Sequence, residues 1–391
     1  TSDDVTVTLS IDAKGEPQLD ITKKGKPLKD IPGKLKKVPE IAELRERKTE
    51  IGKQTSRMRQ SLEESMIRGD SFTTNELKEL FRHPVLKPML ESLVFMTEDG
   101  AIGYPKDNGT FLKGMSSETV LGETRVRLAH SYDLLNTDNW HTWQQECFTA
   151  QRQQPFKQIF RELYVVTNAE LEAEKRSQRY EGHQVNPRQA LALLGNRGWV
   201  AVPEEGVRKT FHQEGLSVWL NFHEGFYTPA DIDGLTINNV MFTKRGEWEP
   251  LSLDSIPPRL FSEVMRDLDL VVSVAHRGGV DPEASASTVE MRSALLRETL
   301  ELLKLENVRL ERSHALIKGQ LGDYSVHLGS ANVHRQPGGS LCIIPVHSQH
   351  RGRIFLPFAD DDPKTAEVVS KVLLLAEDKK IQDPTILEQL R

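Results

Sequence analysis

The histidines are the residues of this chain whose distribution most strongly indicates chemistry. Six of the twelve lie between residues 276 and 350. Imidazole nitrogens bind metals and exchange protons near neutral pH, so this cluster is a candidate ligand-binding or acid–base site. The six are His276, His314, His327, His334, His347 and His350.

A divalent-metal site is one interpretation of this cluster. His347 and His350 would supply imidazole nitrogens, and Asp360 and Asp361 would supply carboxylate oxygens. These ligand types suit a divalent metal. Their spacing matches no motif such as His-Glu-x-x-His, so the pattern does not identify the metal.

A site for an anion or nucleotide is a second interpretation. Arginine forms paired hydrogen bonds with phosphate, and glycine lets a ligand approach the backbone closely. Gly338-Gly339 lies in this region, but the sequence contains no GxxxxGK[ST] or GxGxxG motif. The candidate ligand-binding residues are His327, Ser330, His334, His347, His350, Arg351 and Arg353.

The simpler interpretation of these residues is structural. Loop histidines and arginines then only solvate a turn, and Asp362 caps a helix that begins at Pro363. Convergence of the histidines with Asp360 or Asp361 on one pocket would favour a metal- or nucleotide-dependent hydrolase or transferase. Without that convergence, a binding or regulatory module that recognises an anionic ligand or partner is favoured.

A basic stretch near the N-terminus is a second candidate surface. From Ile21 to Gln60, thirteen Lys or Arg occur with five Asp or Glu, which gives a local charge of +8 in a chain of net charge −6. Such a stripe can bind nucleic acid or an acidic partner, although no interleaved aromatic residue indicates base stacking. A solvated helix with pairs such as Glu43–Arg47 is the simpler interpretation. The candidate basic patch is Lys34, Lys36, Lys37, Arg45 and Lys48.

Strands must position the candidate histidines. Tyr324, Val326 and Leu328 alternate with Ser325 and His327, which predicts a strand with the two groups on opposite faces. Apolar runs at 341–346 and 353–358 predict two buried strands that present His347–Arg353 as a hairpin loop. The β-prone runs at 163–166 and 268–274 indicate further strands.

The remaining pattern indicates an α+β fold with mixed, mainly antiparallel sheets, because strands occur in consecutive runs. Strand patterns near Val5–Ile11 precede a long N-terminal helical arm from Pro39 to about Ile67, and Asn186-Pro187 is a clear helix start. A C-terminal helix is predicted from Pro363 to Ala376. The predicted parts are 1–95, a β-hairpin and basic helical arm; 96–250, a middle α+β region; and 251–391, a C-terminal α+β domain with His-rich strand ends.

Composition excludes several classes of protein. Hydrophobic residues at 37% and charged residues at 28% describe a globular rather than a disordered chain. No apolar run approaches the roughly 18 residues of a membrane helix. Cys147 and Cys342 are too few for a disulfide framework and fit a reducing cytosol, and the five tryptophans are most simply core residues. Because the chain opens at Thr1 rather than Met, we expect it to be a piece of a longer protein.

Three stretches of the sequence resemble a known family. They are 154–164 (QPFKQIFRELY), 256–267 (IPPRLFSEVMRD) and 324–367, which opens with YSVHLGS and ends with FADDDPKTAE. Together they resemble the C-terminal part of large bacterial proteins of the MolR type, a family of domains of unknown function that is sometimes joined to a WGR module. The resemblance covers most of the chain and implies a cytoplasmic bacterial protein linked to the regulation of molybdate metabolism. It also implies a MoxR-type ATPase and a von Willebrand A protein as candidate partners, and it carries over no catalytic residue.

Overall fold

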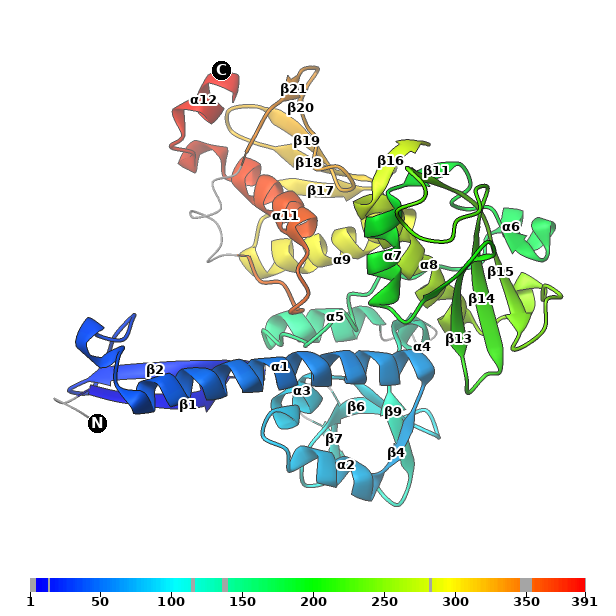
Figure 1. Ribbon diagram of the computed structural model, residues 1–391. Helices are drawn as coiled ribbons and strands as arrows, with labels where there is room; N and C mark the ends of the chain where they lie inside the picture. Colours follow the sequence, from blue (N-terminus) through cyan, green and yellow to red (C-terminus); the bar gives the residue numbers. More distant parts are fainter. Residues whose placement is uncertain are drawn as a thin grey trace. The chain divides into compact units, whose positions relative to one another are not determined.

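The computed structural model describes residues 5–12, 15–113, 117–135, 140–280, 283–344 and 354–390. The chain forms two compact units, one of residues 1–160 with 355–361 and the other of residues 161–354 with 362–391. Helices and mainly antiparallel sheets occur in both units, which confirms the predicted α+β class (Figure 1). The three parts predicted from the sequence are a different division, and they stay a prediction. No described helix is both long and apolar enough to cross a membrane.

A hairpin and a long helix form the N-terminal end of the first unit, as predicted. Strands β1 (Val5–Ile11) and β2 (Pro17–Lys23) pair antiparallel, and β3 (Lys26–Pro27) adds a short edge. Helix α1 (Pro39–Arg68) lies along this hairpin (Figure 1). Apolar side chains of its first turns pack against the hairpin and the single turn η1 (Gly33–Leu35), so the connecting segment is folded rather than a free loop.

The other half of α1 covers a second core of the first unit. Helix α2 begins with a capping box between Thr73 and Glu76, and His83-Pro84 lies between α2 and α3. A sheet of order β4-β9-β5-β6-β7-β8 completes this core. The elements are β4 (Ser71–Thr73), α2 (Thr74–Phe81), α3 (Leu86–Ser92), β5 (Phe95–Thr97), β6 (Ile102–Pro105), β7 (Thr110–Lys113), β8 (Ser117–Val120), β9 (Arg125–Leu128), α4 (Ser131–Leu135) and α5 (Trp140–Thr149).

The segment after α5 has no regular structure, and a buried glutamine in it forms hydrogen bonds with neighbouring backbone groups. The Gln158 side chain is fully buried, and its Nε2 donates to the carbonyl oxygens of Val94 and Ala129 at 2.7 and 2.8 Å. Its Oε1 accepts from the Val94 N–H at 2.9 Å. Gln154 lies beside it and forms an isolated parallel bridge with Phe358, which ties residues 355–361 to this unit. Side-chain amides here replace the hydrogen bonds of a strand.

The second unit begins with a seven-stranded sheet of order β12-β13-β14-β15-β11-β16, in which β10 also pairs with β15. Asn186 caps α7, as predicted, by accepting from the Gln189 N–H at 3.1 Å. The elements are α6 (Asn168–Ala173), β10 (Arg176–Ser177), β11 (His183–Val185), α7 (Pro187–Gly195), β12 (Val200–Val202), β13 (Gly206–Phe211), β14 (Leu216–Phe222), β15 (Leu235–Lys244), η2 (Leu253–Ser255), α8 (Pro258–Val274) and β16 (His276–Gly279).

The rest of the second unit is a five-stranded antiparallel sheet with helices. Helix α11 packs against β18 and β19, and Asp362 caps α11 as predicted. The elements are α9 (Ala286–Leu303), β17 (Val308–Glu311), β18 (His314–Lys318), β19 (Asp323–His327), β20 (Val333–Gln336), β21 (Ser340–Leu341), α11 (Pro363–Ala376), η3 (Asp378–Lys380) and α12 (Pro384–Leu390).

The structure corrects several sequence predictions. Residues 268–274 are the last turns of α8, not a strand, because Leu260, Val264, Leu268 and Val271 continue one helical apolar face. Residues 163–166 form no strand. Of the strand predicted at 341–346, residues 341–344 are described and only Leu341 lies in a strand, β21, whereas residues 354–358 contain only the Phe358 bridge.

The tryptophan prediction was correct in part. Trp143, Trp199 and Trp219 are buried, but Trp248 is 58% exposed, so the core assignment is wrong for Trp248.

We predict that Gln158→Leu destabilises the protein by about 3 kcal/mol, because it leaves buried backbone groups of Val94 and Ala129 without partners. Urea denaturation would measure the loss. The exposed Gln54→Leu on α1 serves as the control and should change stability by less than about 0.5 kcal/mol. Equal stability of the two variants would contradict this role of Gln158.

Candidate functional site

Three of the four described histidines of the cluster, His314, His327 and His334, lie on one face of the five-stranded sheet, whereas His276 lies on β16 of the other sheet. His327 lies opposite His314 in the β18–β19 ladder, and Ser325 lies opposite His334 in the β19–β20 ladder. Directly opposed side chains share a face, so these four residues project from the same side. Tyr324 and its apolar neighbours on β18 and β19 are buried on the other side, against which α11 packs. The alternation predicted from the sequence is therefore confirmed.

His327 is held as a neutral hydrogen-bond donor. Its Nδ1 accepts from the Ser330 N–H at 3.1 Å and lies 2.9 Å from the Ser330 hydroxyl oxygen. An Nδ1 that accepts a hydrogen bond leaves the proton on Nε2. Burial lowers the pKa of His327, and the nearby His314 lowers it further. In this state His327 offers an N–H to a ligand oxygen rather than a lone pair to a metal.

His314 is a member of this face that the candidate list from the sequence lacks. Its ring lies 4.9 Å from that of His327, measured between centroids. Its Nδ1 lies 3.1 Å from the Ser313 hydroxyl. The alternation of His314, Leu316 and Lys318 along β18 is the signal that could have placed it beside His327. We call His314, Ser325, His327 and His334 the histidine face.

The metal interpretation stays a prediction. His347 and His350, with Arg351 and Arg353 of the anion interpretation, lie outside the described residues. Within the described residues, no three His, Cys, Asp or Glu side chains are grouped closely enough to hold a metal.

The aspartates that the metal interpretation uses have other surroundings. Asp360 belongs to the first unit, where its Oδ2 accepts from the Lys157 N–H at 2.9 Å. Asp361 is exposed. The histidine face belongs to the second unit. The histidine face is the donor surface that the described part of the chain offers.

The predicted basic patch lies at the surface of the first unit. Lys34, Lys36 and Lys37 occupy η1 and the residues after it, and Arg45 and Lys48 lie on α1. Lys36 forms an ion pair with Asp30 at 2.7 Å, and the charge of Arg45 also lowers the pKa of Asp30. The predicted Glu43–Arg47 pair is present at 2.7 Å. Ion pairs therefore occur along α1, as the simpler interpretation expects. The segment before α1 is more strongly basic than the helix.

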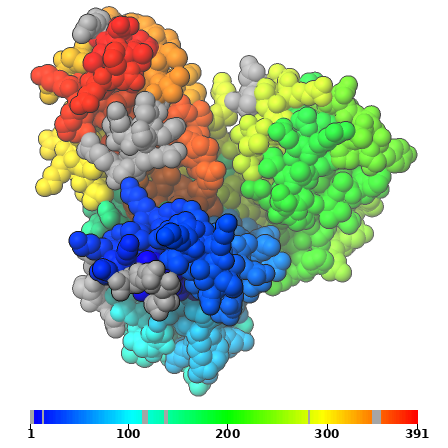
Figure 2. Space-filling view, turned by 60° about the vertical axis from the view of Figure 1, so that its left-hand side comes forward, coloured from blue at the N-terminus to red at the C-terminus, as the bar shows by residue number. Residues whose placement is uncertain are grey.

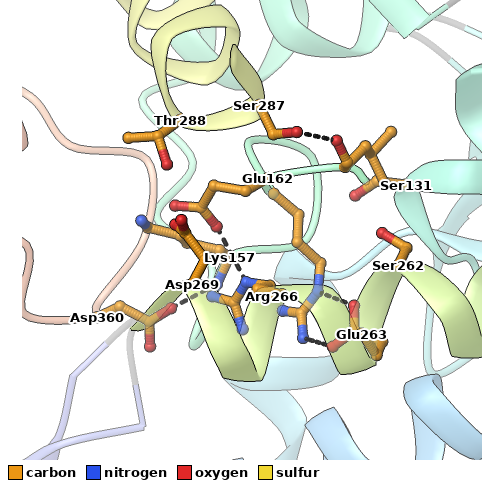
Figure 3. Close-up of polar contacts among 12 residues, drawn as sticks. Ser131, Lys157, Glu162, Ser262, Glu263, Arg266, Asp269, Ser287, Thr288 and Asp360 are labelled. Atoms are coloured by element: carbon orange, nitrogen blue, oxygen red, sulfur yellow. Dashed lines mark hydrogen bonds and ion pairs between the residues drawn. The ribbon is translucent and has the colours of Figure 1, made fainter. Parts of the chain in front are cut away.

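Sequence reasoning did not identify a buried polar network in the second unit. The Arg161 guanidinium donates to both oxygens of Glu263 at 2.7 and 2.6 Å, and both side chains are almost completely buried. One turn further along α8, Arg266 donates to Glu162 at 2.9 Å. Figure 3 shows Glu263 and Arg266 projecting from α8 beside the segment that carries Glu162. Local sequence patterns did not reveal these pairs, because Arg161 and Glu162 lie about a hundred residues from their partners on α8.

Asp269 lies on the same face of α8, and the pKa of its carboxyl is raised. Ser285 lies 3.5 Å from its Oδ2 and also contacts Tyr164 and Thr288. Burial raises the pKa of Asp269, hydrogen bonds with these hydroxyls offset only part of the rise, and the charge of Glu162 adds to it. A carboxyl with a raised pKa among hydroxyl groups is a candidate proton donor or acceptor. The simpler role of this cluster is structural, because Ser285 caps α9.

We predict that Arg161→Met destabilises the protein by about 4 kcal/mol, because it leaves the Glu263 carboxylate buried without its partner. The double variant Arg161→Met, Glu263→Met should regain most of the loss, since no buried charge of the pair remains. Denaturant titration would compare them with Arg309→Met, which removes an exposed pair and should cost below about 1 kcal/mol. A double variant as unstable as the single one would contradict this explanation.

We predict that Asp269→Asn stabilises the protein at pH 7. The folded-state pKa of Asp269 is raised, so ionisation costs folding stability as pH rises above the unfolded value of about 4. The gain of the variant should therefore shrink as pH falls toward that value. Thermal unfolding across this range would measure it, with the exposed Asp233→Asn as the control. A destabilised variant at pH 7 would show that the carboxylate contributes more than its burial costs.

Comparisons with known proteins give two family matches and no assigned activity. A family described as "Domain of unknown function (DUF4132)" matches residues 25–199, and one described as "Domain of unknown function (DUF7737)" matches residues 289–390. The first match spans the basic segment and α1, and the second includes the strands of the histidine face. No curated protein matches the chain, and no solved structure matches it. The chain is therefore similar to two families whose function is unknown.

Proposed function

We propose that this chain is a binding module that recognises a polyanion, the phosphate backbone of a nucleic acid, through the N-terminal end of its first unit. The observation that carries the proposal is a set of seven exposed lysines between residues 23 and 37, with Asp30 as the only acid. We call them the lysine surface. Its members are Lys23, Lys24, Lys26, Lys29, Lys34, Lys36 and Lys37.

The lysine surface is carried by folded structure, which distinguishes it from a charged tail. Ile31 is buried, and Leu28, Leu35 and Val38 pack against the same small core as Ile41 of α1. Figure 2 looks onto this end of the first unit, where the segment lies at the surface. A folded backbone needs no ordering when a ligand binds, so less of the interaction energy is lost than for a disordered tail.

The chemistry of this surface favours phosphates over bases. Lys29, Lys34 and Lys37 have no carboxylate partner among the residues that the structure describes. Ammonium groups act as point charges on phosphate, and each phosphate neutralised releases counterions. No aromatic residue precedes Phe72, so this surface cannot stack bases. Its binding should therefore be strongly dependent on salt and independent of nucleotide sequence.

The histidine face supports a second, smaller element of the same proposal. His327 presents a neutral N–H beside His314, and His334 lies one strand away, so this face can donate to the oxygens of a small anionic ligand. The alternative of a metal- or nucleotide-dependent hydrolase or transferase depends on His347 and His350. Metal analysis of the purified protein would test this alternative.

The cellular setting is also part of the proposal. The stretches that resemble MolR-type proteins support a bacterial, cytoplasmic regulatory protein, and a MoxR-type ATPase with a von Willebrand A protein as its candidate partners. A polyanion-binding surface is compatible with such a regulatory role, since it can localise a protein on nucleic acid without sequence specificity.

We predict that changing Lys29, Lys34 and Lys37 together to Ser weakens binding to a fluorescent duplex DNA. The slope of log affinity against log salt should fall by about 3, because each phosphate contact contributes about 0.9. Changing Lys78, Lys318 and Lys379 to Ser removes the same charge elsewhere and is the control. Equal binding by both triple variants, or binding of polyglutamate but not of DNA, would overturn the proposal.

A further inference from the structure

Two stacked tryptophans form a surface feature of the second unit that the proposed function does not use. Trp219 of β14 and Trp248, which follows β15, lie with ring centroids 4.7 Å apart and planes inclined by 28°. Trp219 is 3% exposed and Trp248 is 58% exposed. Since Trp219 covers one side of Trp248, much of the exposed area of Trp248 belongs to the rest of its ring.

The sheet fixes which side chains accompany this stack. Val200, Arg208, Trp219, Met241 and Arg176 lie opposite one another across β12, β13, β14, β15 and β10, so they share one face of the sheet. The opposite face packs on α8, where Phe242 stacks on Phe261. The stack therefore stands on the side of the sheet that α8 does not cover.

The loop that carries Trp248 is anchored on both sides. The Arg245 N–H donates to the Gly215 carbonyl at 2.7 Å, and the Glu247 N–H donates to the Lys244 carbonyl at 3.0 Å. After Trp248, the chain returns to pair Pro250 with Thr243. The exposed indole is thus held in place by backbone hydrogen bonds and by Trp219, so a planar ligand would meet a preorganised ring.

Trp219 also carries a cost that simple packing does not require. Its indole N–H is buried and has no hydrogen-bond acceptor among the residues that the structure describes. A phenylalanine would fill an apolar position without burying this unpaired donor. Indole offers a larger and more electron-rich ring, which favours stacking and cation–π contacts over plain packing.

The charges around the stack favour an anionic ligand. The Arg208 guanidinium lies over the Trp219 ring at 5.3 Å, and Arg176 is exposed two strands from Trp219, about 10 Å away at the usual strand spacing. Neither arginine has a carboxylate partner in the described part of the chain. Of the two acids beside Trp248, Glu249 is paired with Lys175 at 2.7 Å and Glu247 remains exposed.

We propose that Trp248 is a stacking platform for a nucleobase of single-stranded nucleic acid, with Arg176 and Arg208 near the attached phosphates. A base supplies the planar ring that an exposed, fixed indole can stack, and the arginines supply charge complementarity. This site uses none of the residues of the lysine surface, so it does not depend on the function proposed for that surface. It adds base recognition to a protein whose lysine surface can contact only phosphates.

The test compares a fluorescent oligothymidylate of about eight nucleotides with an abasic strand of the same length and charge, by fluorescence anisotropy. We expect the wild-type protein to bind the oligothymidylate more tightly than the abasic strand. Trp248→Ala should weaken binding of the oligothymidylate by about 10-fold and leave the abasic strand unaffected, with Trp248→Phe intermediate. Tyr227→Ala, which removes another exposed aromatic ring, is the matched control and should behave as wild type.

Three results would overturn the proposal. They are equal binding of the two strands by the wild-type protein, unchanged binding of oligothymidylate by Trp248→Ala, and a change of oligomeric state in Trp248→Ala without loss of base preference. An unchanged thermal midpoint of Trp248→Ala would show that the variant is folded. The lysine-surface variant separates the two proposals, because it should weaken both strands equally and keep their ratio.

Discussion

The buried ion pair between Arg161 and Glu263 is the interaction on which much of the second unit depends. Residues 161–165 have no regular secondary structure, yet Arg161, Glu162 and Tyr164 are largely buried. Backbone groups in such a segment must find partners, and here side chains supply them. Ser262 accepts from the Tyr164 N–H at 3.0 Å, and Ser287 donates to the Leu163 carbonyl. The bidentate pair fixes the register of the segment against α8, so that the smaller hydrogen bonds can form.

The same constraint explains why α8 carries an unusual mixture of residues. One face holds the apolar side chains that pack in the core, and another holds Ser262, Glu263, Arg266 and Asp269 at helical spacing. Because the polar face is also shielded from water, its charges are costly unless paired. Glu263 and Arg266 on this face form ion pairs, whereas Asp269 lies among hydroxyl groups and has a raised pKa. The ionised Asp269 therefore lowers the stability of the fold at a position where its carboxyl is a candidate proton donor or acceptor.

Local signals in the sequence predicted a large part of the fold. The hairpin and α1 follow from alternation and from Pro39, and the caps at Asn186 and Asp362 place α7 and α11. Residues 268–274 were misassigned because a short apolar run does not distinguish a buried strand from the end of a helix. Residues 268–274 are helical because they continue the helix that starts at Pro258, and the packing of that helix in the fold is not visible in the short apolar run.

The candidate sites were predictable to different degrees. The histidine face follows from alternation along β19, but the contribution of His314 requires the pairing of β18 with β19. The Arg161–Glu263 pair joins residues about a hundred positions apart, and the Trp219–Trp248 stack depends on how a loop returns over a sheet. No local periodicity encodes such contacts, since they arise from how separate elements pack.

The parallel bridge between Gln154 and Phe358 has a consequence for the order in which the protein is completed. Residues 355–361 belong to the first unit, although they follow nearly all of the second unit in the chain. During synthesis at about 5–20 residues per second, the first unit must wait some tens of seconds after residue 160 for its last segment. Until then the backbone N–H and carbonyl of Gln154 lack the partners that Pro357 and Ala359 supply, each at 2.9 Å. The first unit therefore begins to emerge from the ribosome early but can close its structure only after nearly all of the second unit has been synthesised.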